Sequence, residues 1–243
     1  MITIRTAEER QHVRYRRHEV WHTFRGGTGD AAEGFGLLRR FDEERIPPGG
    51  AISARAQLDS EVMTYVREGA LTREGRVGVP EILQAGEFRL SAAGRGTDQV
   101  ATNASPRDWA HVFRIWLRVA DAGLTPGPAQ KRVGSAERRG LLCLVASPDA
   151  RRGTLRTHQD ALVCAALLDT GQHVAHELAP GRSAWLHLVR GEVTLGDFVL
   201  STGDGAGFAD ERAVSLIARE ASELLLLDLG QGLPSDGAGA TEP

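Results

Sequence analysis

Short apolar segments alternate with glycine-containing turns along most of the chain. The apolar segments include EVMTYV at 61–66, AHVFRIWLRV at 110–119, AWLHLV at 184–189 and ELLLLDL at 223–229. Turn signals such as Glu-Gly at 68–69 and Arg-Gly at 190–191 separate them. Apolar segments of this length, bounded by glycine, predict strands rather than helices. The pattern therefore predicts an all-β fold built from sandwiches or barrels.

An internal repeat divides the chain into two similar halves. TYVREG at 64–69 has a counterpart in LHLVRG at 186–191, and LQAGEFRLSAAGRG at 83–96 has one in LSTGDGAGFAD at 200–210. The first glycines of these pairs are offset by 122 and 117 positions. Such repetition predicts two copies of one β unit. The segment 121–140, rich in proline, glycine and charge, is predicted to connect them over the surface.

Composition and charge restrict the classes of partner. The 243 residues carry a net charge of −3, which does not favour the broad basic face that nucleic acids attract. The chain is charged from Arg5 onward, without the apolar core of a signal peptide, and no segment approaches the roughly 18 apolar residues of a membrane span. Cys143 and Cys164 lie in apolar segments without a Cys-x-x-Cys motif, so we predict buried thiols. We expect a cytoplasmic protein that binds neither nucleic acid nor membrane.

Several segments together resemble the bacterial pirin family. These are WHTF at 21–24, EVMTYVREG at 61–69, PEILQAGEFRLSAAGRG at 80–96, FRIWL at 113–117 and SPDARRGTLRTHQD at 147–160. The resemblance implies a bicupin, that is, two β-barrel cupin domains packed together. We expect the N-terminal domain at 1–125, the C-terminal domain at 140–230 and a disordered tail at 231–243.

The resemblance also implies a metal site in the N-terminal domain, formed by three histidines and one glutamate. Two of these ligands belong to a His-x-His before the EVMTYV strand, and the others to a His-x-Glu after the Ala-Gly-x-Gly turn. In this sequence those positions hold Arg55 and Gln57, and Gln99 and Ala101. An arginine has no lone pair to donate, and amide oxygens are weak ligands for a transition metal. We therefore predict that the chain binds no metal and uses no cofactor.

The altered site is the candidate ligand pocket. Arg55 could replace the positive charge of the metal and pair with a nearby acid, because buried charges need partners. In the alternative interpretation, the same side chains form a closed polar plug. His111 shares strand parity with Phe113 and Ile115 and could line the pocket or pack in the core. The candidate ligand-binding residues are Arg55, Gln57, Asp59, Glu61, Gln99 and His111.

Other histidines are expected to be structural. His173 and His176 would lie on opposite faces of a strand. His187 falls within the repeated strand of the second half, where we expect it to pack in a filled barrel. His158 is expected to make a structural hydrogen bond at the crossover between the domains.

The resemblance leaves several functions open, since some family members open the flavonol quercetin with oxygen and others are transcriptional co-regulators. Because the metal ligands are replaced, we predict a metal-free small-molecule-binding or regulatory protein rather than a metal-dependent dioxygenase. Its partner would be a small organic ligand or another protein. The alternative is an enzyme. It would be either a metal-independent cupin isomerase or cyclase, or a quercetin 2,3-dioxygenase-like oxygenase with a relocated metal site. The sequence identifies no catalytic residue.

Overall fold

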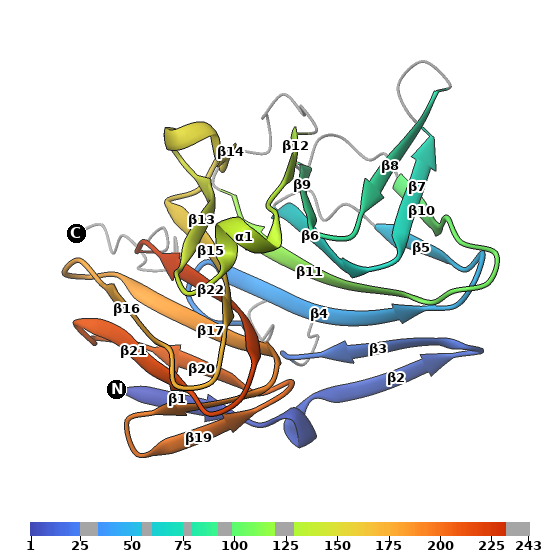
Figure 1. Ribbon diagram of the computed structural model, residues 1–243. Helices are drawn as coiled ribbons and strands as arrows, with labels where there is room; N and C mark the ends of the chain where they lie inside the picture. The colour runs from blue at the N-terminus through green and yellow to red at the C-terminus, as the bar shows by residue number, and fades with distance from the viewer. Residues whose placement is uncertain (25–33, 55–59, 75–78, 92–98, 120–128, 232–243) are drawn as a thin grey trace, which may run out of the picture.

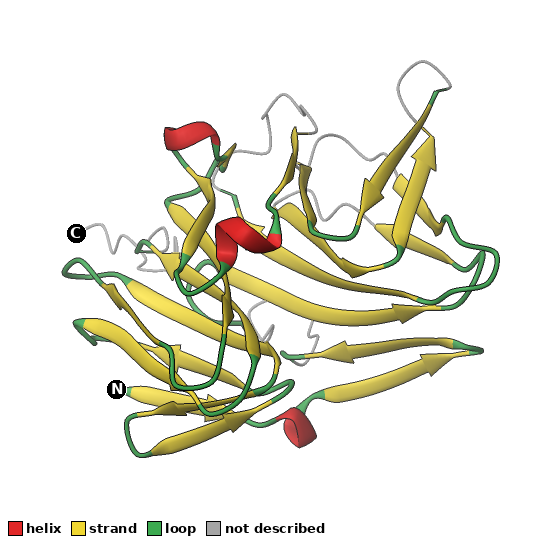
Figure 2. Ribbon diagram, in the orientation of Figure 1, coloured by secondary structure: helices red, strands yellow, loops and turns green. Residues whose placement is uncertain are grey.

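The structure, a computed structural model, describes residues 1–24, 34–54, 60–74, 79–91, 99–119 and 129–231. These residues form two halves, each consisting of a larger and a smaller β-sheet (Figure 1). Strands dominate, and the helices are short (Figure 2). The predicted all-β fold is confirmed. The predicted disordered tail lies outside the described residues, apart from Gln231.

The N-terminal half contains sheets in the strand orders β12-β9-β6-β11-β4-β3-β2 and β5-β10-β7-β8. Its larger sheet consists of β2 (Gln11–Tyr15), β3 (His18–His22), β4 (Leu38–Ile46), β6 (Ser60–Glu68), β9 (Glu87–Ser91), β11 (Ala110–Arg118) and β12 (Ala129–Arg132). Its smaller sheet consists of β5 (Ala51–Ala54), β7 (Ala70–Glu74), β8 (Pro80–Gln84) and β10 (Gln99–Asn103).

The C-terminal half repeats this arrangement, with the orders β1-β20-β17-β22-β15-β13-β14 and β16-β21-β18-β19. The larger sheet consists of β1 (Ile2–Arg5), β13 (Cys143–Ser147), β14 (Leu155–Arg156), β15 (Ala161–Leu168), β17 (Ser183–Arg190), β20 (Gly205–Phe208) and β22 (Ser222–Leu229). The smaller sheet consists of β16 (His173–Glu177), β18 (Glu192–Leu195), β19 (Phe198–Ser201) and β21 (Ala213–Ala218). The helices within the described ranges are α1 (Ser135–Arg138), η1 (Ala7–Glu9) and η3 (Arg151–Gly153). None of the described helices is long and apolar enough to cross a membrane.

The first strand of the chain belongs to the second half. Ile2 pairs with Phe208, and Ile4 pairs with Ala206. In Figure 1, β1 is dark blue and lies beside the orange strands of the C-terminal half. A division at 1–125 and 140–230, which we keep as a proposal, must therefore assign β1 to the second unit.

The repeated glycines occupy equivalent turns. Gly69 links β6 to β7 with φ +79°, and Gly191 links β17 to β18 with φ +97°. A Cβ atom at Gly191 would lie 2.3 Å from the Ser222 Oγ and 2.7 Å from the Ala221 carbonyl oxygen. Glycine alone adopts this conformation at little cost and leaves room for the neighbouring strand. The Arg/Glu-Gly signal in the sequence therefore marks the same hairpin in each half.

Strand alternation divides the buried side chains into separate cores. Odd-numbered residues of β6, such as Met63 and Tyr65, pack in the core between the two larger sheets, whereas Val66 packs inside the N-terminal barrel. The interdomain core joins both halves through Phe41, Met63, Tyr65, Phe88, Phe113, Ile115, Val163, Trp185, Leu225 and Leu227. The interior of the C-terminal barrel is apolar and contains Cys164, Leu186, Leu188, Val193, Phe208, Leu216, Leu224 and Leu226.

Candidate functional site

The interior face of the N-terminal larger sheet carries a row of polar and charged side chains. The strand register places Arg89 opposite Thr64, Thr64 opposite Arg114, Arg114 opposite Asp42, and Asp42 opposite His22. Cross-strand partners in an antiparallel sheet project from the same face. The row therefore crosses β9, β6, β11, β4 and β3 on the side away from the interdomain core. This interior differs in kind from the apolar interior of the C-terminal barrel.

One part of the row surrounds two buried carboxylates. Asp42 accepts hydrogen bonds from His22 Nδ1 at 2.8 Å and Arg40 Nε at 2.6 Å. Glu44 accepts one from His18 Nε2 at 2.8 Å and pairs with Arg114. Burial alone would raise the pKa of Asp42, but the His22 and Arg40 hydrogen bonds outweigh it and lower that pKa. Burial alone would likewise raise the pKa of Glu44, but the charge of Arg114 and the His18 hydrogen bond together outweigh it and lower that pKa.

An aromatic ring lies beside these charges. The Arg40 guanidinium carbon lies 4.8 Å from the centre of the Trp116 ring, and that of Arg114 lies 4.9 Å away. Cations are attracted to the negative face of an indole ring. Trp116 is therefore held between charged groups at the barrel interior, where it is 3% exposed.

A second cluster joins the larger sheet to the smaller one. Arg73 donates to Glu81 Oε2 through Nε at 2.9 Å and Nη2 at 2.7 Å. Arg89 Nη2 donates to the same oxygen at 2.9 Å and to Gln130 Oε1 at 2.7 Å. The Arg89 Nε is buried without a hydrogen-bond partner. Burial and, after it, the charge of Arg73 lower the pKa of Arg89.

The residues predicted from the sequence are only partly brought together. Arg55, Gln57 and Asp59 lie outside the described residues. Gln99 begins β10 opposite Ala54, and its side chain is not described. Ala101 pairs with Ile52 and Arg73 and packs against the apolar end of the barrel. One of the four positions that the resemblance assigns to a metal ligand therefore lies directly beside the Arg73 cluster.

Glu61 does not line the barrel, which corrects the prediction. It shares strand parity with Met63 and Tyr65 and therefore faces the interdomain side of β6. Its carboxylate accepts hydrogen bonds from the His158 ring Nδ1 at 2.8 Å and the His158 backbone N–H at 3.1 Å. Burial raises the pKa of Glu61 despite these bonds. The predicted structural hydrogen bond of His158 at the domain crossover is confirmed.

His111 also lies between the two halves rather than in the barrel interior. Its parity with Phe113 was predicted correctly, but that face of β11 packs in the interdomain core. His111 Nε2 lies 2.8 Å from Glu43 Oε1, and Glu43 Oε2 accepts from Arg10 Nη1 at 2.8 Å. Burial alone would raise the pKa of Glu43. The His111 hydrogen bond and the charge of Arg10 instead lower it to about 2.

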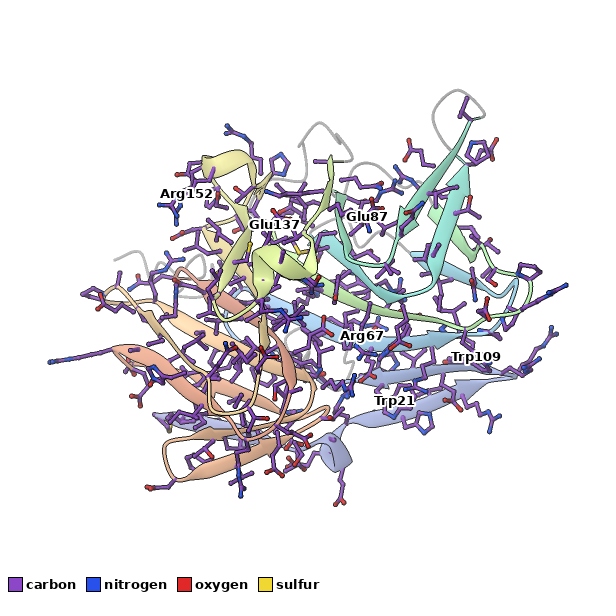
Figure 3. The ribbon with its side chains drawn as sticks, in the orientation of Figure 1. Trp21, Arg67, Glu87, Trp109, Glu137 and Arg152 are labelled. Atoms are coloured by element: carbon purple, nitrogen blue, oxygen red, sulfur yellow. The ribbon has the colours of Figure 1, made fainter. Side chains whose placement is uncertain are left out.

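Sequence reasoning missed a buried charge network around Glu223. Glu223 accepts from Arg67 Nε at 3.1 Å and Arg138 Nη1 at 3.0 Å, and also from the Tyr65 hydroxyl. Figure 3 shows Arg67 near the middle of the molecule. Burial, reinforced by the charge of Glu223, raises the pKa of Tyr65. No local sequence signal joins these residues, because Tyr65 and Glu223 are 158 positions apart.

His187 lies in the interdomain core, not in the interior of the second barrel. It is fully buried, and neither ring nitrogen has a hydrogen-bond partner. Its ring centre lies 4.3 Å from that of Phe41 and 5.7 Å from that of Phe113. Burial, followed by the charge of Arg10, lowers the pKa of His187 to about 3. It is therefore neutral at physiological pH.

The described residues contain no group of three or more histidine, cysteine, aspartate or glutamate side chains that could hold a metal ion. The His–carboxylate pairs of the N-terminal barrel, His18–Glu44 and His22–Asp42, are each also bonded to an arginine. The described interior therefore contains arginine–carboxylate pairs rather than a cluster of metal ligands.

Comparisons with known proteins identify relatives over nearly the whole chain. A family profile described as the quercetinase C-terminal cupin domain matches residues 144–229. The chain is 36% identical over 232 residues to the Escherichia coli (strain K12) protein named quercetin 2,3-dioxygenase, covering 94% of this chain and 99% of that protein. It is 31% identical over 197 residues to a pirin-like protein of Caulobacter vibrioides, covering 80% of this chain and 84% of that protein. The crystal structure of the E. coli pirin YhhW in complex with nickel(II) superposes with a TM-score of 0.84 and 33% identity, covering 96% of this chain and all of that one.

Proposed function

The chain belongs to the pirin family of bicupin proteins, and from that premise we propose that it is a dioxygenase that opens a flavonol such as quercetin with molecular oxygen. The observation that carries the proposal is the 36% identity, over 94% of this chain, to the E. coli protein named quercetin 2,3-dioxygenase. This relationship overturns the prediction of a metal-free binding or regulatory protein. It also overturns the prediction that the chain is not a metal-dependent dioxygenase, because relatives of this kind carry the name of an oxygenase and one was solved with nickel(II).

The contrast between the two barrels supports the N-terminal one as the substrate site. The C-terminal interior is filled by apolar side chains such as Leu186, Leu188 and Phe208. The N-terminal interior presents the guanidinium groups of Arg89 and Arg114 on either side of Thr64. A polyhydroxylated aromatic molecule needs hydrogen-bonding groups of this kind to fix its orientation.

The metal implied by the family requires a separate test against the residues present. The four positions assigned to ligands hold Arg55, Gln57, Gln99 and Ala101. The guanidinium of Arg55 and the methyl group of Ala101 supply no atom that can coordinate a metal. The amide oxygens of the two glutamines are weak ligands and do not replace the imidazoles and carboxylate of a three-histidine, one-glutamate centre. These residues do not fit that centre. As part of the proposal, the interior arginines act on the substrate directly, and no step is assigned to a metal.

The test is turnover of quercetin by the full chain, purified without a histidine tag. Loss of flavonol absorbance and consumption of oxygen are followed together, with separate additions of iron(II), nickel(II), manganese(II) and a chelator. We expect oxygen-dependent loss of quercetin above the rate without protein. A rate no greater than that background under every metal condition would refute the proposal.

A matched pair of variants locates the site. Thr64 is half-buried in the interior row between Arg89 and Arg114, so Thr64→Met should fill the barrel and reduce turnover at least tenfold. Thr194 is half-buried on β18, in the smaller sheet of the other half, so Thr194→Met should leave turnover unchanged. Equal activities of the two variants would contradict a site in the N-terminal barrel.

A further inference from the structure

From a free strand edge flanked by arginines, we infer that the β2–β3 hairpin is a docking surface for an extended, acidic segment of another protein. β2 is the last strand of the larger N-terminal sheet, and β3 is its only partner among the described strands. The inference concerns the outer surface of the molecule and does not depend on the proposed function.

The free edge of β2 is open to a further strand. In Figure 1, β2 runs along the lower margin of the N-terminal half, on the side of β3 away from β4. Four of its five residues are exposed. An edge strand presents backbone N–H and C=O groups that an added strand can pair with. An extended polypeptide is therefore the type of partner that matches this edge, because neither a lipid head group nor a nucleic acid continues the ladder.

The turn end of the hairpin is positively charged. Arg16 and Arg17 form the turn, and Arg45 on β4 and Arg107 before β11 lie toward the same end of the sheet. All four are exposed, and none forms an ion pair with another described residue. The nearby Asp108 accepts a hydrogen bond from a serine hydroxyl of its own loop. This excess of cations attracts an acidic partner and disfavours a basic one.

Ring contacts hold the hairpin in place. The rings of His12 and Trp21 stack with their centres 4.5 Å apart and their planes 5° apart. The Arg17 guanidinium carbon lies 5.5 Å from the centre of the Trp109 ring, which joins the turn to the start of β11. Figure 3 shows Trp21 along the hairpin and Trp109 near its turn. An edge that is already ordered loses little conformational entropy when a partner binds.

Alternation along β2 specifies the side chains of the partner. His12 and Arg14 project from one face of the hairpin, and Val13 and Tyr15 project from the other. The Arg14 side chain is 62% exposed and lies 3.7 Å from Glu19, so it remains accessible to an added strand. Such a strand would place alternate side chains beside Arg14 and the intervening ones beside Val13 and Tyr15. The matching chemical class is an extended segment in which acidic residues alternate with apolar residues.

The same charges disfavour pairing with a second copy of this chain. Antiparallel pairing of two β2 edges would place His12 and Arg14 of both copies on one face of the joined sheet. Like charges on neighbouring strands are destabilising, and exposed charges on an edge protect it from self-association. The surface is therefore suited to a different, acidic chain.

The experiment uses a short fluorescent peptide of alternating glutamate and valine, with binding to the full chain followed by fluorescence anisotropy. We expect saturable binding that weakens at high salt, and no binding of a peptide of alternating lysine and valine. A glutamate–valine peptide methylated on all its backbone nitrogens keeps the charge but cannot donate to the strand edge. It should bind at least about tenfold more weakly. Equal affinities of the methylated and unmethylated peptides would overturn the inference.

A matched pair of double variants tests the arginines. Arg14→Glu combined with Arg17→Glu should weaken binding of the glutamate–valine peptide at least about tenfold. Arg156→Glu combined with Arg212→Glu changes the net charge equally at exposed arginines of the C-terminal half and should change the affinity less than about twofold. Circular dichroism verifies that both proteins are folded. Equal weakening in the two double variants would overturn the inference, because it would show attraction by net charge alone.

Hydrogen exchange on the wild-type chain locates the peptide without any substitution. Exchange of the backbone amides of 11–15 should slow when the glutamate–valine peptide is bound, and unchanged exchange there would contradict docking at β2. Phosphatidylglycerol vesicles and single-stranded oligothymidylate are tested in parallel. Binding of either one, without binding of the peptide, would assign the arginines to a different class of partner and overturn the inference.

Discussion

The buried histidine of the interdomain core gives the sharpest prediction about stability. His187 has no hydrogen-bond partner for either ring nitrogen and lies between Phe41 and Phe113. Its pKa is lowered from 6.5 to about 3, mainly by burial. The unfolded chain therefore takes up a proton on this residue below pH 6.5, while the folded chain resists it. Stability contributed by the neutral ring is present above pH 6.5 and is lost as the pH falls toward 3.

The size of the effect follows from the shift. One pKa unit corresponds to about 1.4 kcal/mol, so protonation of the unfolded chain reduces the free energy of unfolding by about 2 kcal/mol at pH 5. The full difference approaches about 5 kcal/mol near pH 3 as an upper limit. At pH 7 the unsatisfied nitrogens should make His187→Leu more stable than wild type by about 1–3 kcal/mol, partly offset by lost ring contacts.

The assay is urea unfolding of wild type, His187→Leu and His187→Gln between pH 4.5 and 8. Because other acids titrate over this range, the quantity to compare is each variant minus wild type. We expect that difference to grow by about 2 kcal/mol from pH 7 to pH 5 for both variants. His187→Gln keeps a polar group but does not titrate, so it isolates the proton from the unsatisfied nitrogens. His173→Gln, at an exposed histidine, is the control for a substitution outside the core. If the free energies of unfolding of the two His187 variants, each minus wild type, stay constant with pH, the reasoning is refuted.

Three further substitutions test the packing and hydrogen bonds. Burial raises the pKa of Glu61, so the wild-type protein loses stability as the pH rises through that pKa and the buried carboxyl group ionises. Glu61→Gln does not ionise, so its free energy of unfolding relative to wild type should increase between pH 4.5 and 7 in chemical unfolding. A decrease of that relative free energy over this range would contradict the reasoning. Gly205→Ala should cost about 1–3 kcal/mol, because the new Cβ would lie 2.3 Å from Trp185 Cζ2; an unchanged melting temperature would count against that contact. Tyr65→Phe removes a hydroxyl bonded to a buried carboxylate and should cost about 1–3 kcal/mol in urea unfolding, whereas no loss would argue against the bond.

The sequence predicted the fold because its signals are local. Glycine turns and apolar segments mark strands independently of distant partners, and Gly69 and Gly191 occupy equivalent hairpins, as the repeat predicted. The placement of β1 was not predictable in this way. Its partner β20 lies at the opposite end of the chain, and nothing in residues 2–5 specifies that pairing.

The candidate site was predicted less well, because alternation shows which residues share a face but not which face lines a barrel. Glu61 and His111 were grouped with the interior, yet both lie on the interdomain side. The Arg73–Glu81–Arg89 cluster was missed, since it forms only when β8 and β9 approach across the two sheets. The face of a strand that packs between the two halves is recognised from its large apolar residues, such as Met63, and not from the polar residues on that face.

The pairing of β1 with β20 also has a consequence for synthesis. Residues 2–5 leave the ribosome about 200 residues before their partners at 205–208. At about 5–20 residues per second, that interval is about 10–40 seconds. During it the edge of β1 has no partner, and the larger sheet of the C-terminal half cannot be completed. Folding of the C-terminal half should therefore finish only after residues 205–208 have been synthesised. A fragment that ends near residue 125 would leave β1 as an unpaired edge open to aggregation.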